Sequence, residues 1–304
     1  MSESKRVVLV TGASAGIGFA TALDLARRGC SLRIVGRDPS KTERARAAIA
    51  EIDPSVVAFR ADFSSLASVR AFANDLLARD EPLHVVIHNA GVWHPELARS
   101  KDGLEDTIAV NHLAPFLLTH LLLPRLRESD GDRRIVHVSS RLHTQAGETA
   151  SVRGRVVHLA NIAGLRVRSQ GAHLDLDALD HDPHYRGIEA YARSKLAQVV
   201  FSCELARREK TVTSNAVHPG SVATEVTRNN AVLARLNALA TPFLKTPAQG
   251  AETSVYVATA PSLRGVTGRY FARSKEAPYA SIADDREVAA RLWRWSAERV
   301  GLDV

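Results

Sequence analysis

A glycine-rich turn follows directly on a short apolar run near the start of the chain. Residues 6–10 are apolar and β-rich, residues 11–18 carry three glycines, and residues 19–28 are typical of a helix. An apolar run without alternation is typical of a strand buried on both faces. Glycines let the backbone approach a pyrophosphate, and a helix N-terminus offers free N–H groups there. This order predicts a dinucleotide-binding turn. The contacts expected from its Gly-x-x-x-Gly-x-Gly spacing are Gly12, Ser14, Ala15, Gly16, Ile17 and Gly18.

Strand and helix patterns then alternate along the chain. Apolar, β-rich runs take turns with helix-forming runs at 31–35, 41–50, 56–60, 66–79, 83–87, 104–126 and 134–138. Regular alternation is the signature of a parallel sheet covered by helices. We therefore expect an α/β fold, with one Rossmann-type, doubly wound parallel sheet, helices on both faces, and a single domain over 1–304. Such sheets bind ligands at the carboxyl ends of their strands.

Polar residues stand at these predicted strand ends. Arg37 follows the second strand, where a basic side chain suits the 2′-phosphate of NADP and an acidic one suits the ribose of NAD. We favour NADP(H) over NAD(H), although the next residue, Asp38, either reads the ribose or starts the following turn. The alternative is that both charges are simply solvated. Further cofactor contacts are expected after the third and fourth strands, from Asp62, Phe63, Asn89, Ala90 and Gly91.

Tyr191 and Lys195 lie in a run without Gly or Pro, 188–208, that predicts a helix. Positions i and i+4 share a helix face, so the two side chains point the same way. A phenol titrates near 10, and a nearby ammonium in a partly desolvated cleft lowers that pKa and makes the Tyr an acid or base. The spacing alone is common by chance, and the alternative is a Tyr covering an apolar face beside a solvated Lys.

Two further polar residues accompany this pair. Asn111 lies inside an apolar stretch and needs hydrogen-bond partners, so it is either a structural bridge or the holder of a water in a proton path. Ser139 and Ser140 follow the fifth predicted strand, where a hydroxyl points at the same cleft and is able to hold a substrate carbonyl.

Composition narrows the classes of partner. The formal net charge is +7, but basic residues are mixed with acidic ones along the chain. We therefore expect no nucleic-acid partner, while an anionic small ligand benefits from the positive excess. His181 and His184 flank a predicted turn, and no pattern predicts a metal site. The two cysteines, Cys30 and Cys203, are expected to be packing residues in a reducing cytoplasm. The absence of a long apolar run predicts no membrane partner.

Taken in order, these motifs resemble the short-chain dehydrogenase/reductase family over nearly the whole chain. They are Thr11-Gly-x-x-x-Gly-Ile-Gly18, Asn89-Ala-Gly91, Asn111, Ser140, Tyr191-x-x-x-Lys195 and His218-Pro219-Gly220. The segments 110–119 and 291–295 look most like the retinol dehydrogenase branch.

The resemblance implies a hydride transfer between nicotinamide C4 and a carbonyl carbon. It assigns proton transfer to Tyr191, its activation and a ribose contact to Lys195, carbonyl orientation to Ser140 and a relay water to Asn111. It implies nicotinamide-side contacts from Pro219, Gly220, Val222 and Thr224. Family members often dimerise through the helices of Asn111 and Tyr191, so a homodimer or homotetramer is expected.

The chain departs from the usual pattern of the family at two points that bear on the substrate. Tyr191 follows Ser140 by 51 positions, which is more than the family normally has, so residues 145–173 are predicted to be an insertion near the active site. Residues 221–247 are predicted to be a substrate lid. Retinol dehydrogenases are often membrane-anchored and this chain shows no anchor, so the resemblance supports the chemistry rather than retinol. The substrate contacts expected are Trp93, His94, Leu142 and Tyr185.

The leading hypothesis is an NADP(H)-dependent oxidoreductase of the carbonyl reductase type, acting on a small, largely apolar carbonyl, alcohol or imine. One alternative is a biosynthetic enzyme that uses the same scaffold for a step without net redox, such as a cyclisation. Another is a non-catalytic NADP-binding interaction protein, for which an intact Tyr191–Lys195 pair serves no purpose.

Overall fold

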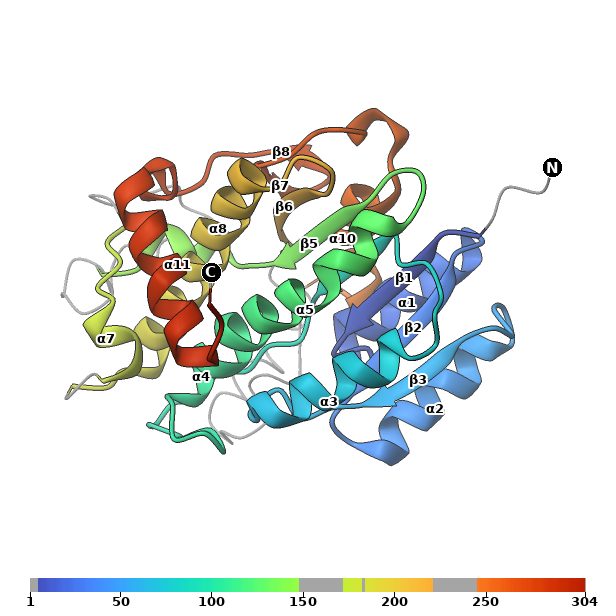
Figure 1. Ribbon diagram of the computed structural model, residues 1–304, viewed down its shortest axis with the longest axis horizontal. Coiled ribbons are helices and arrows are strands. Elements are labelled where there is room, and N and C mark those ends of the chain that lie inside the picture. The colour runs from blue at the N-terminus through green and yellow to red at the C-terminus, as the bar shows by residue number, and fades with distance from the viewer. Residues whose placement is uncertain (1–4, 148–171, 182–183, 221–244, 304) are drawn as a thin grey trace.

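The computed structural model describes residues 5–147, 172–181, 184–220 and 245–303 (Figure 1). The predicted insertion, 145–173, and the predicted lid, 221–247, lie almost entirely outside these residues. Val222 and Thr224 lie outside them as well.

The described residues form one eight-stranded sheet with the order β3-β2-β1-β4-β5-β6-β7-β8. The strands up to β7 are parallel, and β8 pairs with β7 antiparallel. Their bounds are β1 Val7–Thr11, β2 Ser31–Gly36, β3 Val57–Arg60, β4 Val85–His88, β5 Arg134–Val138, β6 Thr213–His218, β7 Tyr270–Ala272 and β8 Lys275–Glu276. The predicted fold class is therefore confirmed. The strand order reverses between β1 and β4, and this is where such sheets bind ligands.

Helices cover both faces of the sheet. Their bounds are α1 Gly16–Arg27, α2 Pro39–Ala50, α3 Leu66–Leu77, α4 Asp106–Ile108, α5 Ala114–Glu128, α7 Asp177–Asp180, α8 Gly187–Arg208, α10 Pro247–Thr259 and α11 Arg286–Val300. Between α4 and α5 the chain makes one π-helical turn, Ala109–Leu113, where the sequence predicts ordinary helix. The strands β6 to β8 and the helix α10 are elements that the sequence patterns did not single out.

Successive residues of the central strand face opposite layers of the core. Val8 and Val10 pack in a cluster with α1, α2 and α10, whereas Leu9 packs in a second cluster with α3 and α5. Both sets are fully buried, which explains why this strand reads as a continuous apolar run. In Figure 1, α3 and α5 lie side by side, and their contact is direct.

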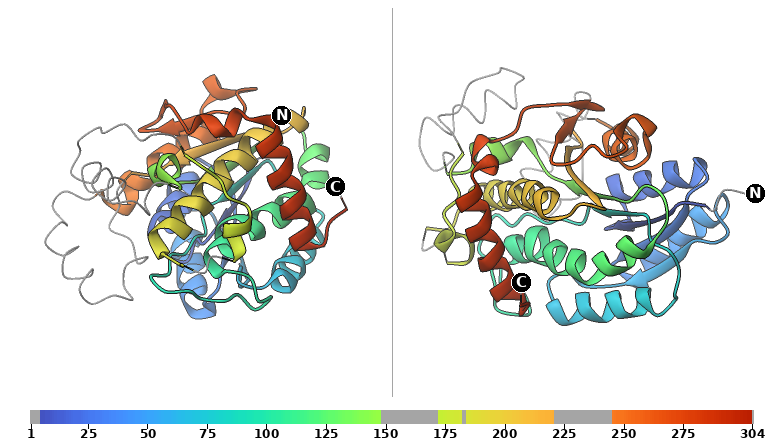
Figure 2. Two further views of the ribbon diagram at one scale, coloured as in Figure 1. Left: turned by 90° about the vertical axis from the view of Figure 1, so that its left-hand side faces the viewer. Right: turned by 45° about the horizontal axis from the view of Figure 1, so that its top comes forward.

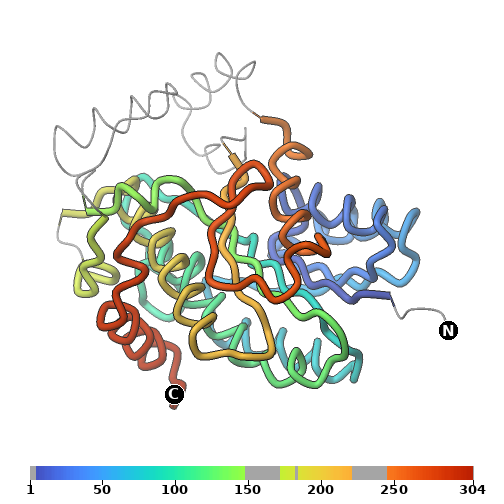
Figure 3. Tube along the Cα trace, turned by 90° about the horizontal axis from the view of Figure 1, so that it is seen from above, coloured from blue at the N-terminus to red at the C-terminus, as the bar shows by residue number. Residues whose placement is uncertain are grey.

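The helix α8 is buried along almost its whole length. The helix α11 runs beside it and contacts it directly (Figure 2). Trp293 of α11 packs with its ring centroid 5.3 Å from that of Phe116 and 5.7 Å from that of Phe201. In Figure 3, α11 and the blue N-terminal region lie on opposite sides of the molecule. The C-terminal helix therefore closes the core on the side of α8.

The expectation that no apolar run is long enough to cross a membrane is wrong, by length and composition, for one helical stretch in the described part, Asp106–Glu128. Its most apolar window is 83% buried inside the fold, as expected for a core helix.

Candidate active site

The glycine turn after β1 lies against the loop after β4. Gly12 and Gly16 have φ of 66° and 59°, which suit glycine. A Cβ on Gly12 would lie 2.9 Å from Ala90 Cα, and one on Gly18 would collide with Asn89 Nδ2. Only glycine fits both positions, so the backbone between β1 and α1 forms a bare cradle at the N-terminus of α1. This cradle fits a pyrophosphate.

Hydrogen bonds join the ends of β1 and β4. Asn89 Nδ2 donates to the Thr11 carbonyl at 2.9 Å, and Thr11 Oγ1 accepts from the backbone N–H groups of Asn89 and Ala90 at 2.9 Å each. A Cβ on the next residue, Gly91, would lie 3.1 Å from Asn111 Oδ1 and 3.4 Å from Lys195 Nζ. The 89–91 loop therefore connects the cofactor turn to the polar residues predicted to be catalytic.

Asn111 lies in the π-helical turn, a feature often found at functional sites. Its Nδ2 donates to the Val92 carbonyl at 3.0 Å and to Ser194 Oγ at 2.9 Å, and its Oδ1 accepts from Val92 N–H at 2.8 Å. These contacts form the structural bridge that was one of the two sequence-based interpretations. The role as a water holder stays a prediction.

Ser140 and Tyr191 meet at the carboxyl end of β5. Ser140 caps the short 3₁₀ helix Arg141–Gln145, and its Oγ accepts from Leu142 N–H at 3.3 Å. Burial raises the pKa of Tyr191 to about 12, and a hydrogen bond with Ser140 offsets part of this effect. The Tyr191 hydroxyl is therefore protonated at neutral pH in the protein alone.

Lys195 lies beneath Tyr191 in the protein interior. Its Nζ is 5.5 Å from the centroid of the Tyr191 ring, and it donates to the Val138 carbonyl and to Gln198 Oε1 at 3.0 Å each. Burial lowers its pKa to about 7. The sequence predicts that Lys195 lowers the pKa of Tyr191, but in the protein alone desolvation acts more strongly on both groups.

The tip of β2 presents Arg37, which is exposed. Asp38 caps α2, and its carboxylate accepts from Lys41 N–H at 2.9 Å, so its carboxylate serves the following turn. Asp62 pairs with Lys101 at 2.9 Å; burial opposes its ionisation, but this pair and a bond from Ser64 N–H outweigh burial and lower its pKa. The Phe63 side chain is buried in the core.

The predicted substrate contacts lie around the loop after β4. Tyr185 donates from its hydroxyl to the His94 carbonyl at 3.0 Å, and His94 Nε2 lies 2.7 Å from Asp106 Oδ2. Trp93 is half-buried, and its indole N–H has no partner among the described residues. Leu142 packs against the core beside α8. The side chains of Tyr185 and His94 thus brace this loop, and direct contact with substrate stays a prediction for all four.

Comparison with known proteins decides the family. Residues 6–170 match the family described as short chain dehydrogenase. The chain belongs to this family. Retinol dehydrogenase 12 of Bos taurus is 40% identical over 301 residues, which cover 98% of this chain and 87% of that protein. Retinol dehydrogenase 13 of Homo sapiens is 38% identical over 310 residues, which cover 98% of this chain and 86% of that protein. The predicted resemblance to the retinol dehydrogenase branch is confirmed.

Solved structures share the fold of this short-chain dehydrogenase. A crystal structure of an uncharacterized protein from Mycobacterium Paratuberculosis is 27% identical, covers 98% of this chain and 94% of that chain, and superposes with a TM-score of 0.73. The family and its relatives identify the chain as a hydride-transfer oxidoreductase that uses a nicotinamide cofactor.

Three buried residues that support the short-chain dehydrogenase site were not singled out from sequence. Ser194 and Gln198 hold Asn111 and Lys195, and His143 Nδ1 lies 2.6 Å from the Ser140 carbonyl. Ser194 and Gln198 lie one and three positions from Lys195. A polar residue inside a buried helix is a usable signal, because such a group needs a partner.

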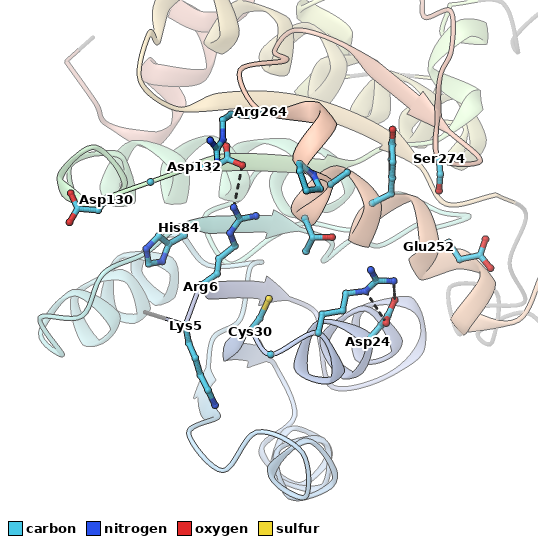
Figure 4. A pocket seen from close by; sticks show the side chains of 17 residues that line it. Lys5, Arg6, Asp24, Cys30, His84, Asp130, Asp132, Glu252, Arg264 and Ser274 are labelled. Atoms are coloured by element: carbon cyan, nitrogen blue, oxygen red, sulfur yellow. Dashed lines mark hydrogen bonds and ion pairs between the residues drawn. The ribbon is translucent and has the colours of Figure 1, made fainter. Parts of the chain in front are cut away.

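A groove of about 900 Å³ runs from Arg6, His84 and Asp132, at the amino ends of β1, β4 and β5, along α10 to Ser274 (Figure 4). Charges of both signs line it and pair with each other, such as Arg6 with Asp132 at 3.2 Å and Arg28 with Asp24 at 3.1 Å. The residues predicted to be catalytic do not line this groove, and we assign no ligand to it.

Proposed function

We propose that this short-chain dehydrogenase catalyses NADP(H)-dependent hydride transfer to or from a carbonyl, alcohol or imine, with Tyr191 as the acid and base. The observation that carries the proposal is the grouping of Ser140, Tyr191 and Lys195 at one edge of the sheet, connected through Gly91 to the bare glycine cradle. A non-catalytic binder has no use for this group.

The residues divide the reaction between them. The nicotinamide supplies or accepts the hydride when it is bound. In reduction, Ser140 orients the carbonyl, and the Tyr191 hydroxyl donates its proton to the oxygen as that oxygen gains charge. With a pKa of about 12, Tyr191 carries the proton that this direction requires. Lys195 stabilises the resulting phenolate when it is charged, and solvent returns the proton. Oxidation runs the same proton transfers in reverse.

The preference for NADP(H) rests on the tip of β2. Arg37 is exposed there, while the adjacent carboxylate of Asp38 is taken up by the N-terminus of α2. A guanidinium at this position binds a 2′-phosphate through charge-assisted hydrogen bonds, which are stronger than its hydrogen bonds to a neutral ribose hydroxyl.

The remaining expectations are proposals of the same kind. The half-buried Val92, Trp93 and Leu142 favour a small substrate that is largely apolar around the reacting carbon. Buried, unpaired Cys30 and Cys203 fit a reducing compartment, the cytoplasm. Any homodimer or homotetramer must accommodate α11, which lies over α8.

The proposal is tested by comparing the turnover of the wild-type protein with that of a variant that lacks the Tyr191 hydroxyl. NADPH oxidation and NADP reduction are measured over a broad panel of ketones, imines and alcohols, in parallel with NADH and NAD. We expect Tyr191→Phe to abolish turnover and to retain cofactor binding, measured by cofactor fluorescence. Tyr256→Phe is the matched control, because Tyr256 lines the groove of Figure 4 rather than the predicted catalytic group, and its change should leave turnover intact. Full activity in Tyr191→Phe, or product formed without NADPH, contradicts the proposal.

A further inference from the structure

Three basic side chains gather at the carboxyl ends of β5, β6 and β7. Arg141 directly follows Ser140 after β5, and Arg273 directly follows β7. The register pairs Val138 with Val217 and His218 with Ala272, so these ends lie at the same level of the sheet. The third basic residue, Lys245, reaches the end of β6 from beyond residues 221–244.

The contact between Lys245 and Gly220 is close. A Cβ built on Gly220 would lie 2.6 Å from Lys245 Cδ and 3.4 Å from its Nζ. Gly220 has φ of 97°, in the region that favours glycine. The ammonium of Lys245 is therefore held against the turn that the family resemblance assigns to the nicotinamide side.

Within the described ranges, none of Arg141, Lys245 and Arg273 is paired with a carboxylate. Some basic residues of this chain have such partners, among them Arg33 with Glu81 at 2.6 Å, and others, such as Arg264, have none among the described residues. His218 lies among the three cations. Burial first, and then Arg141, His143, Lys245 and Arg273, lower its pKa to about 3. Its buried Nδ1 has no partner among the described residues. Among the described residues, this corner of the site is therefore positive and lacks a carboxylate counter-ion.

Arg273 is held in a backbone conformation that costs stability. Arg273 and Ser274 both have φ of 54°, and they form the two-residue turn between the antiparallel strands β7 and β8. Two positive φ angles are the mark of a type I′ turn, which strongly favours Asn-Gly. An arginine there is locally disfavoured, and such positions cluster at functional sites. The turn does not explain why an arginine occupies this position, whereas a role for its positive charge would.

We infer that Arg141, Lys245 and Arg273 hold an anionic group of the substrate, a carboxylate or a phosphate, beside Ser140. The inference rests on the proposed function and deepens it: the substrate is apolar around its reacting carbon and anionic at its other end. The cofactor's own phosphates are the other source of such a group. The glycine cradle that suits the pyrophosphate follows β1, however, and β4 and β5 separate β1 from β6 and β7. The position of the cluster therefore favours the substrate.

Kinetics with a matched pair of ketones test this assignment. The probes are 5-oxo-5-phenylpentanoate and its methyl ester, which differ in one charge. We expect kcat/KM for the acid to exceed that for the ester by about tenfold, because only the acid carries a charge that the three cations attract. Arg273→Asn and Lys245→Met should each bring this ratio down about fivefold, mainly through KM.

Arg273→Asn is the informative variant, because Asn is favoured in a type I′ turn. Its thermal midpoint should be equal to or higher than that of the wild type, which separates loss of charge from loss of folding. Arg264→Gln is the matched control, since Arg264 lies at the amino edge of the sheet and its change should leave the ratio unchanged. A wild-type ratio near one, or a ratio that Arg273→Asn and Lys245→Met do not move, overturns the inference.

Binding tests the inference without turnover. In Tyr191→Phe loaded with NADP, calorimetry should show 5-phenylpentanoate binding about tenfold more tightly than 5-phenylpentanamide. Anion binding without turnover of any ketone would sink the proposed function and keep this inference. Equal affinities for acid and amide would sink the inference. If Arg273→Asn weakens NADPH binding and leaves the acid-to-ester ratio intact, the cluster serves the cofactor, and the assignment to substrate is wrong.

Discussion

Asn111 Nδ2 lies 2.9 Å from Ser194 Oγ, and Ser194 Oγ donates in turn to the Tyr191 carbonyl at 2.8 Å. This chain of bonds ties the π-helical turn of Asn111 to the turn of α8 that carries Tyr191. We therefore expect Ser194, which needs no contact with substrate or cofactor, to position the backbone that carries the Tyr191 side chain.

We expect Ser194→Ala to reduce kcat about tenfold, because a small displacement of a reacting group is costly. The lost bonds should also lower the free energy of unfolding by about 1 kcal/mol. Ser202→Ala is the control: Ser202 is buried on the same helix, and its Oγ is 3.0 Å from Ser214 Oγ. Urea unfolding and steady-state kinetics should show similar destabilisation in both variants and a loss of kcat only in Ser194→Ala. Equal kcat values would show that the bond has no positioning role.

Gly18→Ala should weaken cofactor binding at least tenfold, since the new methyl group would collide with Asn89 Nδ2 and the Gly12 carbonyl in the cradle. Gly265→Ala is the comparison, because Gly265 has φ of 75° and open space around it at the amino edge. That change should lower stability by about 1 kcal/mol and leave the cofactor Kd unchanged. Fluorescence titration with NADPH measures both variants, and an unchanged Kd in Gly18→Ala would contradict the cradle.

Arg37→Ala should lower the ratio of kcat/KM with NADPH to that with NADH by about 10- to 100-fold, as expected when a guanidinium–phosphate pair is lost. Arg46→Ala should leave the ratio unchanged, because Arg46 pairs with Glu43 on the exposed side of α2 at 2.7 Å. A preference for NADH in the wild-type enzyme would refute the assignment of Arg37.

Buried histidines make the fold sensitive to acid. Burial lowers the pKa of His88 and of His112 to about 3. In the unfolded chain a histidine has a pKa of about 6.5. As the pH falls from 6.5 toward 3, the unfolded chain therefore binds protons at these histidines and the folded chain does not. The contribution of these two histidines to stability is therefore complete above pH 6.5 and declines below it, by on the order of 2 kcal/mol for each histidine at pH 5.

Replacing one buried histidine and its hydrogen-bond partner tests whether buried histidines cause the loss of stability in acid. His112 Nε2 lies 2.7 Å from Ser296 Oγ, so His112→Leu with Ser296→Ala removes both polar groups. The loss of unfolding free energy between pH 7.5 and pH 5 should shrink by about 2 kcal/mol in this variant. His181→Leu changes an exposed histidine and should not alter the loss. Identical pH dependence in all three proteins would exclude His112 as a source of acid sensitivity.

The order of strands and helices was readable because it depends on local patterns. Buried parallel strands appear as continuous apolar runs, and the glycine turn stands where β1 ends and α1 begins, so the α/β fold followed from the sequence. The four polar residues predicted to be catalytic were found through their resemblance to a family motif. The strands β7 and β8 were not predicted, because a strand of two or three residues is too short to show a periodic pattern of apolar residues.

The sequence by itself determined the fold class, the glycine cradle and the candidate tetrad, since each is written in spacing along the chain. The tertiary structure alone decided which groups those residues meet. Asn111 and Ser194 are 83 positions apart, and Lys195 reaches a carbonyl 57 positions away. It also decided that burial dominates the pKa values of Tyr191 and Lys195, and that Arg141, Lys245 and Arg273 share one corner. The physical reason is that desolvation and charge depend on distance through space, which local periodicity does not encode.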